Sequence, residues 1–246
     1  FISLEQARLN LQHEIPGWSL KQVYENTKKE WNDKLSRLTI KGGSERDARI
    51  FYTALYHSYL FPREFSEYGR YYSAFDDRIH EGISYNDYSL WDTFRAFHPL
   101  MTLLEPQLTG DWITSLLQMY KEGGWLPMWP NPTYTNIMIA THADAVIADA
   151  YMKGIRNFDV NLAYEAIRKD AMVPPDCDTN RKYGDRDYWT SYEGRAGASY
   201  YHSIGYVPDD KTAESVSRTL EYAYDDWCVA QMAKSLGKME DYAHLM

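Results

Sequence analysis

Apolar residues recur at three- and four-residue steps along most of the chain, which is the period of an amphipathic α-helix. The three clearest stripes predict helices over residues 45–60, 90–104 and 216–236. Each stripe stops at a helix-breaking residue: Pro62 after Phe61, Pro106, and Gly237. The pattern therefore predicts a protein built mainly of helices.

Shorter stripes predict further helices over residues 4–14, 20–37, 109–121, 136–153, 160–172 and 238–246. The segment 136–153 is apolar on nearly all sides, so we expect it to be covered on both faces. Only the short pieces 38–41 and 70–75 have the pattern of strands. The predicted fold class is all-α with minor β structure.

Two stretches, residues 61–88 and 174–210, lack helical periodicity and are rich in aromatic residues. Loops longer than about 12–15 residues are uncommon in compact domains unless they are functional or disordered. Their aromatic content argues against disorder. Over the whole chain, 22 Tyr, 8 Trp and 8 Phe make up 15% of the residues. These rings could stack on sugars or could simply fill the core, and composition leaves both interpretations open.

Charge and motifs exclude several classes of function. The chain has 26 Lys and Arg against 35 Asp and Glu, and a net charge of −9 disfavours nucleic acid as a partner. No apolar run is long enough to predict a membrane span. Phosphate-loop, dinucleotide-binding, zinc-protease and serine-hydrolase motifs are absent from the sequence. Cys177 and Cys228 fit no metal or redox spacing and could be free or paired.

The segment SLWDTFR at 89–95 places a tryptophan, a carboxylate and a guanidinium close together on one helix. Trp91, Asp92 and Arg95 are spaced three and four residues apart, outside the apolar stripe of that helix. A tryptophan can stack on a sugar ring, and an aspartate can accept hydrogen bonds from two hydroxyls. The alternative is an ion pair between Asp92 and Arg95 beneath a structural tryptophan.

The segment GGWLPMWPNP at 123–132 cannot be helical, because three prolines and two glycines interrupt it. It predicts a stiff loop that carries Trp125 and Trp129 ahead of the apolar segment 136–153. Such a loop could hold a stacking platform for a ligand at little entropic cost. It could equally be a packed hydrophobic turn.

Glu221 and Asp225 lie one helical turn apart beside Tyr222, Tyr224 and Trp227. A pair of carboxylates could act as acid and base in sugar cleavage, but this spacing is too close for an inverting pair, which needs about 6.5–9.5 Å. The alternative is hydrogen bonding inside a helical bundle. The same structural interpretation is open for His142 and Asp149.

Four segments together resemble glycoside hydrolase family 92. They are SLWDTFRAFHPL at 89–100, GGWLPMWP at 123–130, MIATHADAVIADAYMKG at 138–154 and GYVPDDKTAESVSRTLEYAYDDWCVAQMAKSLGK at 205–238. Members of this family are mostly bacterial exo-acting α-mannosidases that are secreted or periplasmic. The resemblance implies an N-terminal β-sandwich followed by an (α/α)6 barrel of helices, and calcium-dependent hydrolysis with inversion.

The resemblance also implies functional residues. Trp91 and Asp92 would line the pocket for the terminal mannose, and we group Arg95 and Trp129 with them as candidate substrate-binding residues. Calcium would be the cofactor, with its ligands outside this chain. The sequence Thr133-Tyr134-Thr135 departs from the Asn-Glu-Thr common in the family. This departure leaves the linkage specificity open.

The family's general acid and base fall in motifs that would follow Met246, so we expect neither in this chain. Residues 1–246 would then form a partial helical catalytic domain, inactive when isolated, in a glycosidase acting on mannose-containing glycans. One alternative is a noncatalytic carbohydrate-binding or interaction module of the same fold. Another is a helical polysaccharide lyase, although the negative net charge argues against acidic sugars.

Overall fold

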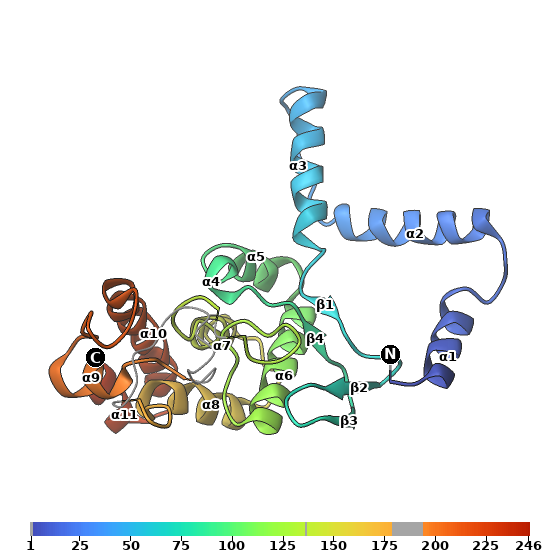
Figure 1. Ribbon diagram of the computed structural model, residues 1–246. Helices are drawn as coiled ribbons and strands as arrows, with labels where there is room; N and C mark the ends of the chain where they lie inside the picture. Colours follow the sequence, from blue (N-terminus) through green and yellow to red (C-terminus); the bar gives the residue numbers. More distant parts are fainter. Residues whose placement is uncertain (1, 136, 179–193) are drawn as a thin grey trace.

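The computed structural model describes residues 2–135, 137–178 and 194–246. Helices dominate, and the strands form only two small two-stranded sheets, β1 with β4 and β2 with β3 (Figure 1). The helices are α1 Leu4–Glu14, α2 Leu20–Leu35, α3 Glu45–Ser58, α4 Leu90–Thr93, α5 Phe97–Leu104, α6 Pro106–Gly123, α7 Ala143–Met152, α8 Val160–Met172, α9 Ala198–Ile204, α10 Ser215–Ser235 and α11 Met239–Leu245. The strands are β1 Arg63–Glu64, β2 Arg70–Ser73, β3 Arg78–Glu81 and β4 Tyr85–Asn86.

The hydrophobic core lies where α6, α7, α8 and α10 pack together. Its central side chains are fully buried and come from all four helices: Ile113, Leu116, Ile147, Ile167 and Met232. The short helix α5 closes this group on the side of α6 and α7. We call the described residues from 90 to 246 the body.

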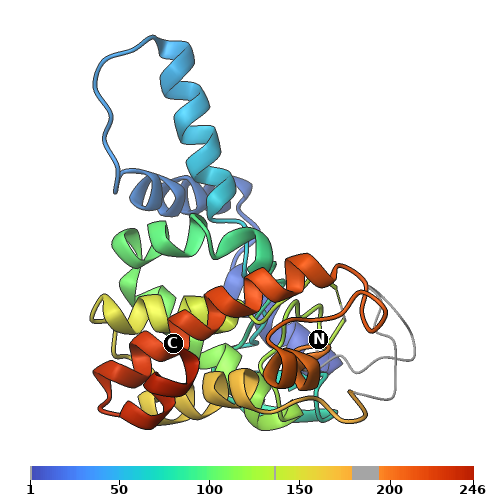
Figure 2. The ribbon, with the colours of Figure 1, turned by 90° about the vertical axis from the view of Figure 1, so that its left-hand side faces the viewer.

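Residues 2–62, which include α1, α2 and α3, stand out from the body as an arm (Figures 1 and 2). Each arm helix starts at a serine whose hydroxyl accepts a backbone N–H of the first turn: Ser3, Ser19 and Ser44. Within the arm only Gln6 and Leu55 are buried, whereas Trp18 is 94% exposed. Local capping therefore defines these helices, while tertiary packing contributes little to them.

Polar contacts at two places attach the arm to the rest of the chain. Near the end of α2, Lys34 Nζ lies 3.1 Å from the buried carboxylate of Glu105, and Arg37 donates to the carbonyl of Leu104 at 2.8 Å. Near α1, the backbone N–H of Ile2 donates to Glu67 at 2.7 Å. The arm is thus anchored near its start and in its middle.

The helix predicted over residues 90–104 is wrong as a single element, because the chain forms α4 and then α5. Ala96 between them has φ −140° and ψ −43°, outside helical geometry. Pro99 has no N–H, and its ring would clash with the carbonyl of Arg95 in a continuous helix. The break turns the two halves of the apolar stripe in different directions.

The helix predicted over residues 136–153 is wrong in its first half, since α7 starts only at Ala143. Met138 and Ala140 have φ values of 67° and 66°, in the left-handed region that no α-helix uses. The N–H of Thr141 donates to Asp225 on α10 at 3.0 Å, which fixes the chain in this irregular path. Residues 143–152 are buried on nearly all sides, as predicted for this segment.

Of the two predicted strands, one is confirmed and one is wrong, and the stretch predicted to lack helices contains one. The strand at 70–75 is confirmed as β2, which pairs antiparallel with β3, but residues 38–41 have no strand partner and form no strand. Helix α9 lies within 174–210, where none was predicted; residues 179–193 of that stretch lie outside the described residues. Gly197 and Gly205, both with positive φ, bound α9.

The long helix α10 confirms the prediction over residues 216–236 but presents an unexpected face to the core. Its apolar stripe is largely exposed, with Val216 at 72% and Leu220 at 67% exposure. The opposite face, which carries Tyr222 and Asp225, is fully buried. A helix with apolar residues on one face and a buried polar network on the other cannot be oriented by periodicity alone.

Candidate functional site

The predicted sugar-contacting residues of α4 lie together at the surface of the body. The Asp92 carboxylate is exposed and makes no hydrogen bond or ion pair with any described residue. Trp91 is half-buried, and the guanidinium of Arg95 lies 5.0 Å from its ring centroid. The indole Nε1 of Trp91 is buried without an acceptor among the described residues. The motif thus contains an exposed carboxylate without a partner, on Asp92, and a buried indole N–H without an acceptor, on Trp91.

Arg95 pairs with Glu221 on α10, at 2.7 Å, and not with Asp92. This pair joins two segments that are 126 residues apart in the sequence. Arg95 also lies 4.6 Å over the ring of Phe94. The alternative interpretation of the motif, an ion pair between Asp92 and Arg95, therefore does not describe this structure.

Behind Arg95, His142 is held between two carboxylates one turn apart on α10. Its Nδ1 lies 2.9 Å from Asp225 Oδ1, and its Nε2 lies 3.5 Å from Glu221 Oε2. The imidazole stacks on Phe94 with centroids 3.9 Å apart and an interplanar angle of 15°. These contacts fix His142, which is 1% exposed, and through it the position of Glu221.

A buried ion network around Arg195 continues inward from His142. The Arg195 guanidinium pairs with Asp226, and with Asp144 at 3.0 Å. Its Nε donates to the hydroxyl of Thr141 at 2.9 Å, and that hydroxyl donates to Asp144 at 2.7 Å. Although burial alone would lower the pKa of Arg195, Asp226 and Asp144 raise it above its usual range. The network holds the start of α7 against α10.

The carboxyl groups of Asp144 and Asp170 are both fully buried near this arginine. Burial raises the pKa of Asp144 well above its usual value and raises the pKa of Asp170 to about 8. Neither oxygen of Asp170 receives a hydrogen bond from a fixed donor of the described residues. These raised pKa values favour the protonated, uncharged form of Asp170 at neutral pH, which removes one buried charge.

The loop over residues 123–132 does not bring its tryptophans to this site by any polar or ring contact among the described residues. Trp129 is half-buried, and its carbonyl accepts a hydrogen bond from the Thr135 hydroxyl at 2.7 Å. The ammonium of Lys169 lies 4.2 Å from the Trp125 ring centroid. The loop is not helical beyond the end of α6 at Gly123, as predicted, whereas its stiffness and the role of Trp129 in sugar binding stay predictions.

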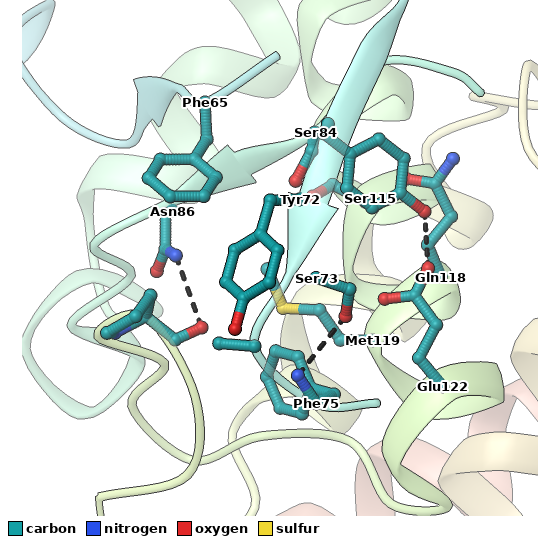
Figure 3. A pocket seen from close by; sticks show the side chains of 13 residues that line it. Phe65, Tyr72, Ser73, Phe75, Ser84, Asn86, Ser115, Gln118, Met119 and Glu122 are labelled. Carbon is teal, nitrogen blue, oxygen red and sulfur yellow. Dashed lines mark hydrogen bonds between the residues drawn. The ribbon is translucent and has the colours of Figure 1, made fainter. Parts of the chain in front are cut away.

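A groove beside the site and a hollow elsewhere in the molecule differ greatly in size. The groove, of about 330 Å³, lies beside Arg95, between α10, α7 and the start of α5, and is lined by Phe94, Tyr224 and Trp227. The hollow beneath the β2–β3 hairpin, lined by Phe65 and Tyr72, is only about 10 Å³ and has room for one water molecule (Figure 3). Of these two, only the groove is large enough to admit a sugar ring.

The described residues do not provide a metal centre of their own. No group of three or more His, Cys, Asp or Glu side chains in the described ranges is arranged to hold a metal ion. The buried carboxylates of Asp144 and Asp226 already pair with Arg195. Cys177 and Cys228 are both free, which resolves their pairing. No described helix is both long and apolar enough to cross a membrane.

The exposed Asp92 carboxylate beside Trp91 offers an acceptor and an apolar ring face, the two groups predicted for contact with a sugar. The chain belongs to the family of glycosyl hydrolase family 92 catalytic domains, whose family model matches residues 6–246. This result confirms the resemblance found in the sequence.

Individual relatives are considerably longer than this chain. A solved family GH92 inverting mannosidase from Bacteroides thetaiotaomicron is 37% identical, with a TM-score of 0.90 over 100% of this chain and 32% of its own. A GH92 α-mannosidase from the same species is 32% identical, with a TM-score of 0.83 over 100% of this chain and 31% of its own. An uncharacterized secreted glycosidase of Arthroderma benhamiae is 34% identical over 97% of this chain and 27% of its own. The chain spans about a third of the length of these relatives.

Sequence reasoning missed the residues that organise the site from within. Arg195 lies in a stretch without periodicity, and no local signal marks it as the centre of an ion network. Asp226 could have been found, because an Asp-Asp pair within an amphipathic helix places one carboxylate toward the core. His142 was weighed only as a satisfied core residue, and its position between Glu221 and Asp225 depends on contacts distant in sequence.

Proposed function

We propose that this chain is part of the helical catalytic domain of an exo-α-mannosidase that removes terminal α-linked mannose from glycans. The complete enzyme would be secreted or periplasmic, which the secreted glycosidase of Arthroderma benhamiae supports. Residues 1–246 would form one part of an (α/α)6 barrel, which agrees with the greater length of the relatives. Hydrolysis would be calcium-dependent and would proceed with inversion.

The observation that carries this proposal is the free carboxylate of Asp92 beside Trp91. An exposed aspartate without a partner can accept hydrogen bonds from two sugar hydroxyls while the indole face covers the ring. Arg95 is held by Glu221 at 2.7 Å, so its guanidinium is oriented before a ligand arrives. These side chains bind and orient the terminal sugar.

The same geometry supports assigning the acid and the base to residues outside this chain. Glu221 and Asp225 are occupied by Arg95 and His142, and Asp226 is bound to Arg195. An inverting enzyme needs two carboxyl groups about 6.5–9.5 Å apart on opposite sides of the scissile bond. Calcium, when bound, would supply Lewis-acid chemistry to the complete site. The described residues contain no cluster that fits this ion, so its ligands would come from elsewhere in the complete enzyme.

The test of the site is Asp92→Ala in the complete gene product. Each charge-assisted hydrogen bond contributes about 1.5–3 kcal/mol, so two of them amount to about 3–6 kcal/mol. We expect kcat/KM for an aryl α-mannoside to fall by at least about a hundredfold. The melting temperature should not change, since Asp92 has no partner in the fold.

Asp33→Ala is the matched control, because Asp33 is an exposed aspartate on α2 whose carboxylate also has no partner. That variant should keep both kcat/KM and melting temperature. A clear loss of stability in Asp92→Ala with near-normal kcat/KM would refute the binding role of Asp92.

The isolated 246-residue chain offers a second test of the same proposal. It should release no mannose from any α-mannoside, because the acid and the base are assigned to residues outside this chain. Turnover by this chain that disappears on mutation of one of its own carboxylates would mean that the catalytic centre has been misplaced.

A further inference from the structure

A second cavity, which shares no lining residue with the α4 motif, lies where the arm meets the β4 and α6 segments. Its volume is about 300 Å³, within the range of small-ligand sites. The walls come from the C-terminal half of α2, the residues after α3, β4 and the first turns of α6. We call it the junction cavity.

Four aromatic side chains from four different segments line the junction cavity: Trp31, Tyr59, Tyr85 and Trp112. Trp31 contacts Tyr56 at a centroid distance of 4.4 Å, and Tyr85 meets Trp112 edge to face at 6.4 Å. These neighbours fix the orientations of the rings before any ligand arrives. Aromatic rings presented from several sides suit the flat apolar faces of a pyranose.

The Glu30 carboxylate gives the cavity a hydrogen-bond acceptor. It is exposed and has no hydrogen bond or ion pair with any described residue. A carboxylate without a partner can accept hydrogen bonds from the hydroxyls of a sugar that stacks on the surrounding rings.

The charges around the cavity balance one another. Lys34 and Arg37 both pair with Glu105, at 3.1 and 3.0 Å, and the hydroxyl of Tyr59 donates to the same carboxylate at 3.2 Å. With the unpaired Glu30, two positive charges therefore meet two negative ones. A neutral sugar brings no charge of its own and could donate its hydroxyl hydrogens to Glu30.

We propose that the junction cavity is a second sugar-binding site, distinct from the Asp92 site, which takes a neutral pyranose. The choice of mannose as its probe rests on the proposed function, while the recognition chemistry does not. A sugar bound there would contact the arm through Trp31 and the α6 side through Trp112. Occupation of the site would therefore also stabilise the attachment of the arm.

The test uses the complete gene product carrying Asp92→Ala, so that binding at the α4 motif is weakened. Isothermal titration with α-1,2-mannobiose should detect one saturable site. Adding Trp31→Ala should weaken this binding by at least about tenfold, and adding Glu30→Gln should weaken it severalfold. Adding Trp18→Ala should leave it unchanged, since Trp18 is 94% exposed on the same arm and does not line the cavity.

Circular dichroism of each variant ensures that a lost helix is not mistaken for a lost contact. If Trp31→Ala loses helical signal, Glu30→Gln alone decides, because Glu30 makes no contact that supports the fold. Unchanged affinity in a folded Trp31→Ala protein, or in Glu30→Gln when Trp31→Ala is unfolded, would overturn the proposal. So would the absence of any saturable binding in the Asp92→Ala protein.

The two proposals fail separately. A complete gene product that cleaves no mannoside but binds mannobiose in a Trp31-dependent way would contradict the proposed function and keep the second site. A product that cleaves mannosides but binds no sugar once Asp92 is replaced by alanine would contradict the second site and keep the proposed function.

Discussion

The helices of the arm and those of the body are equally well signalled in the sequence, but they differ in what stabilises them. The arm helices have serine caps and clear apolar stripes, yet α2 contributes no buried residue, and α3 contributes only Leu55. In the body, α6 buries nine of its 18 residues and α7 buries eight of its 10. The comparison shows that local signals determine where a helix forms, whereas its stability depends on the surfaces available to cover it.

The same contrast extends to charge. The charged contacts that attach the arm are half exposed on the basic side, as with Lys34 and Arg37 against Glu105. In the body, Arg195 and Asp144 are completely buried. Exposed pairs contribute little to stability, but removal of one partner from a buried pair leaves an uncompensated charge.

Arginine substitutions should give the largest difference between the body and the arm in the free energy of unfolding. Arg195→Met should lower the free energy of unfolding by about 3–5 kcal/mol, because it strands buried carboxylates. Arg37→Met at the attachment of the arm should cost about 1 kcal/mol or less, since Lys34 still pairs with Glu105. Urea unfolding followed by tryptophan fluorescence measures both, and similar losses would invalidate the distinction.

Isoleucine substitutions should give a smaller difference in unfolding free energy between the body and the arm. Ile147→Ala on α7, at a fully buried position, should cost about 2–5 kcal/mol. Ile50→Ala on α3, where the side chain is 58% exposed, should change the unfolding free energy by no more than about 0.5 kcal/mol. A large loss for Ile50→Ala would show that the apolar face of the arm is covered in solution.

Stability of the body should depend on pH through Asp170, and that of the arm should not. The pKa of Asp170 is raised to about 8 in the folded protein, so between pH 4 and 8 the native state keeps a proton that the unfolded state has released. Stability from this group is therefore complete at low pH and is lost as pH rises through about 8. Asp170→Asn should flatten this dependence in thermal unfolding measured from pH 5 to pH 9.

Asp149→Asn is the control for this pH experiment, because Asp149 is on the exposed side of α7 and pairs with Lys153. It should keep the wild-type slope. An Asp170→Asn protein with an unchanged slope would mean that the buried carboxyl pair does not hold a proton.

The smallest effect concerns backbone strain at the start of α7. Ala140→Gly should stabilise the protein by up to about 1 kcal/mol, because φ is 66° there and glycine adopts this conformation without cost. Ala148→Gly, in the interior of α7, should instead destabilise it by about 0.5–1 kcal/mol. Calorimetric melting temperatures that shift in the same direction for both variants would contradict this assignment of strain.

Much of the fold could be predicted from the sequence because its signals are local. Helix α8 has the predicted bounds, and α1 does as well. The failures have long-range causes: the left-handed residues before α7 are fixed by Asp225 on α10. Pro99 is the exception, since its effect on the helix over residues 90–104 was local and could have been anticipated.

In the candidate site too, only the local contacts could be predicted from the sequence. The proximity of Trp91, Asp92 and Arg95 follows from helical spacing. The partner of Arg95 does not, since Glu221 lies 126 residues away and only the packing of α10 brings it close.

The most direct test of the central claim is proton NMR of α-1,2-mannobiose during cleavage by the complete gene product, before and after treatment with EDTA. The account predicts release of mannose as the β-anomer first, as inversion requires, with activity lost to EDTA and restored by calcium. No release of mannose under any of these conditions would contradict it.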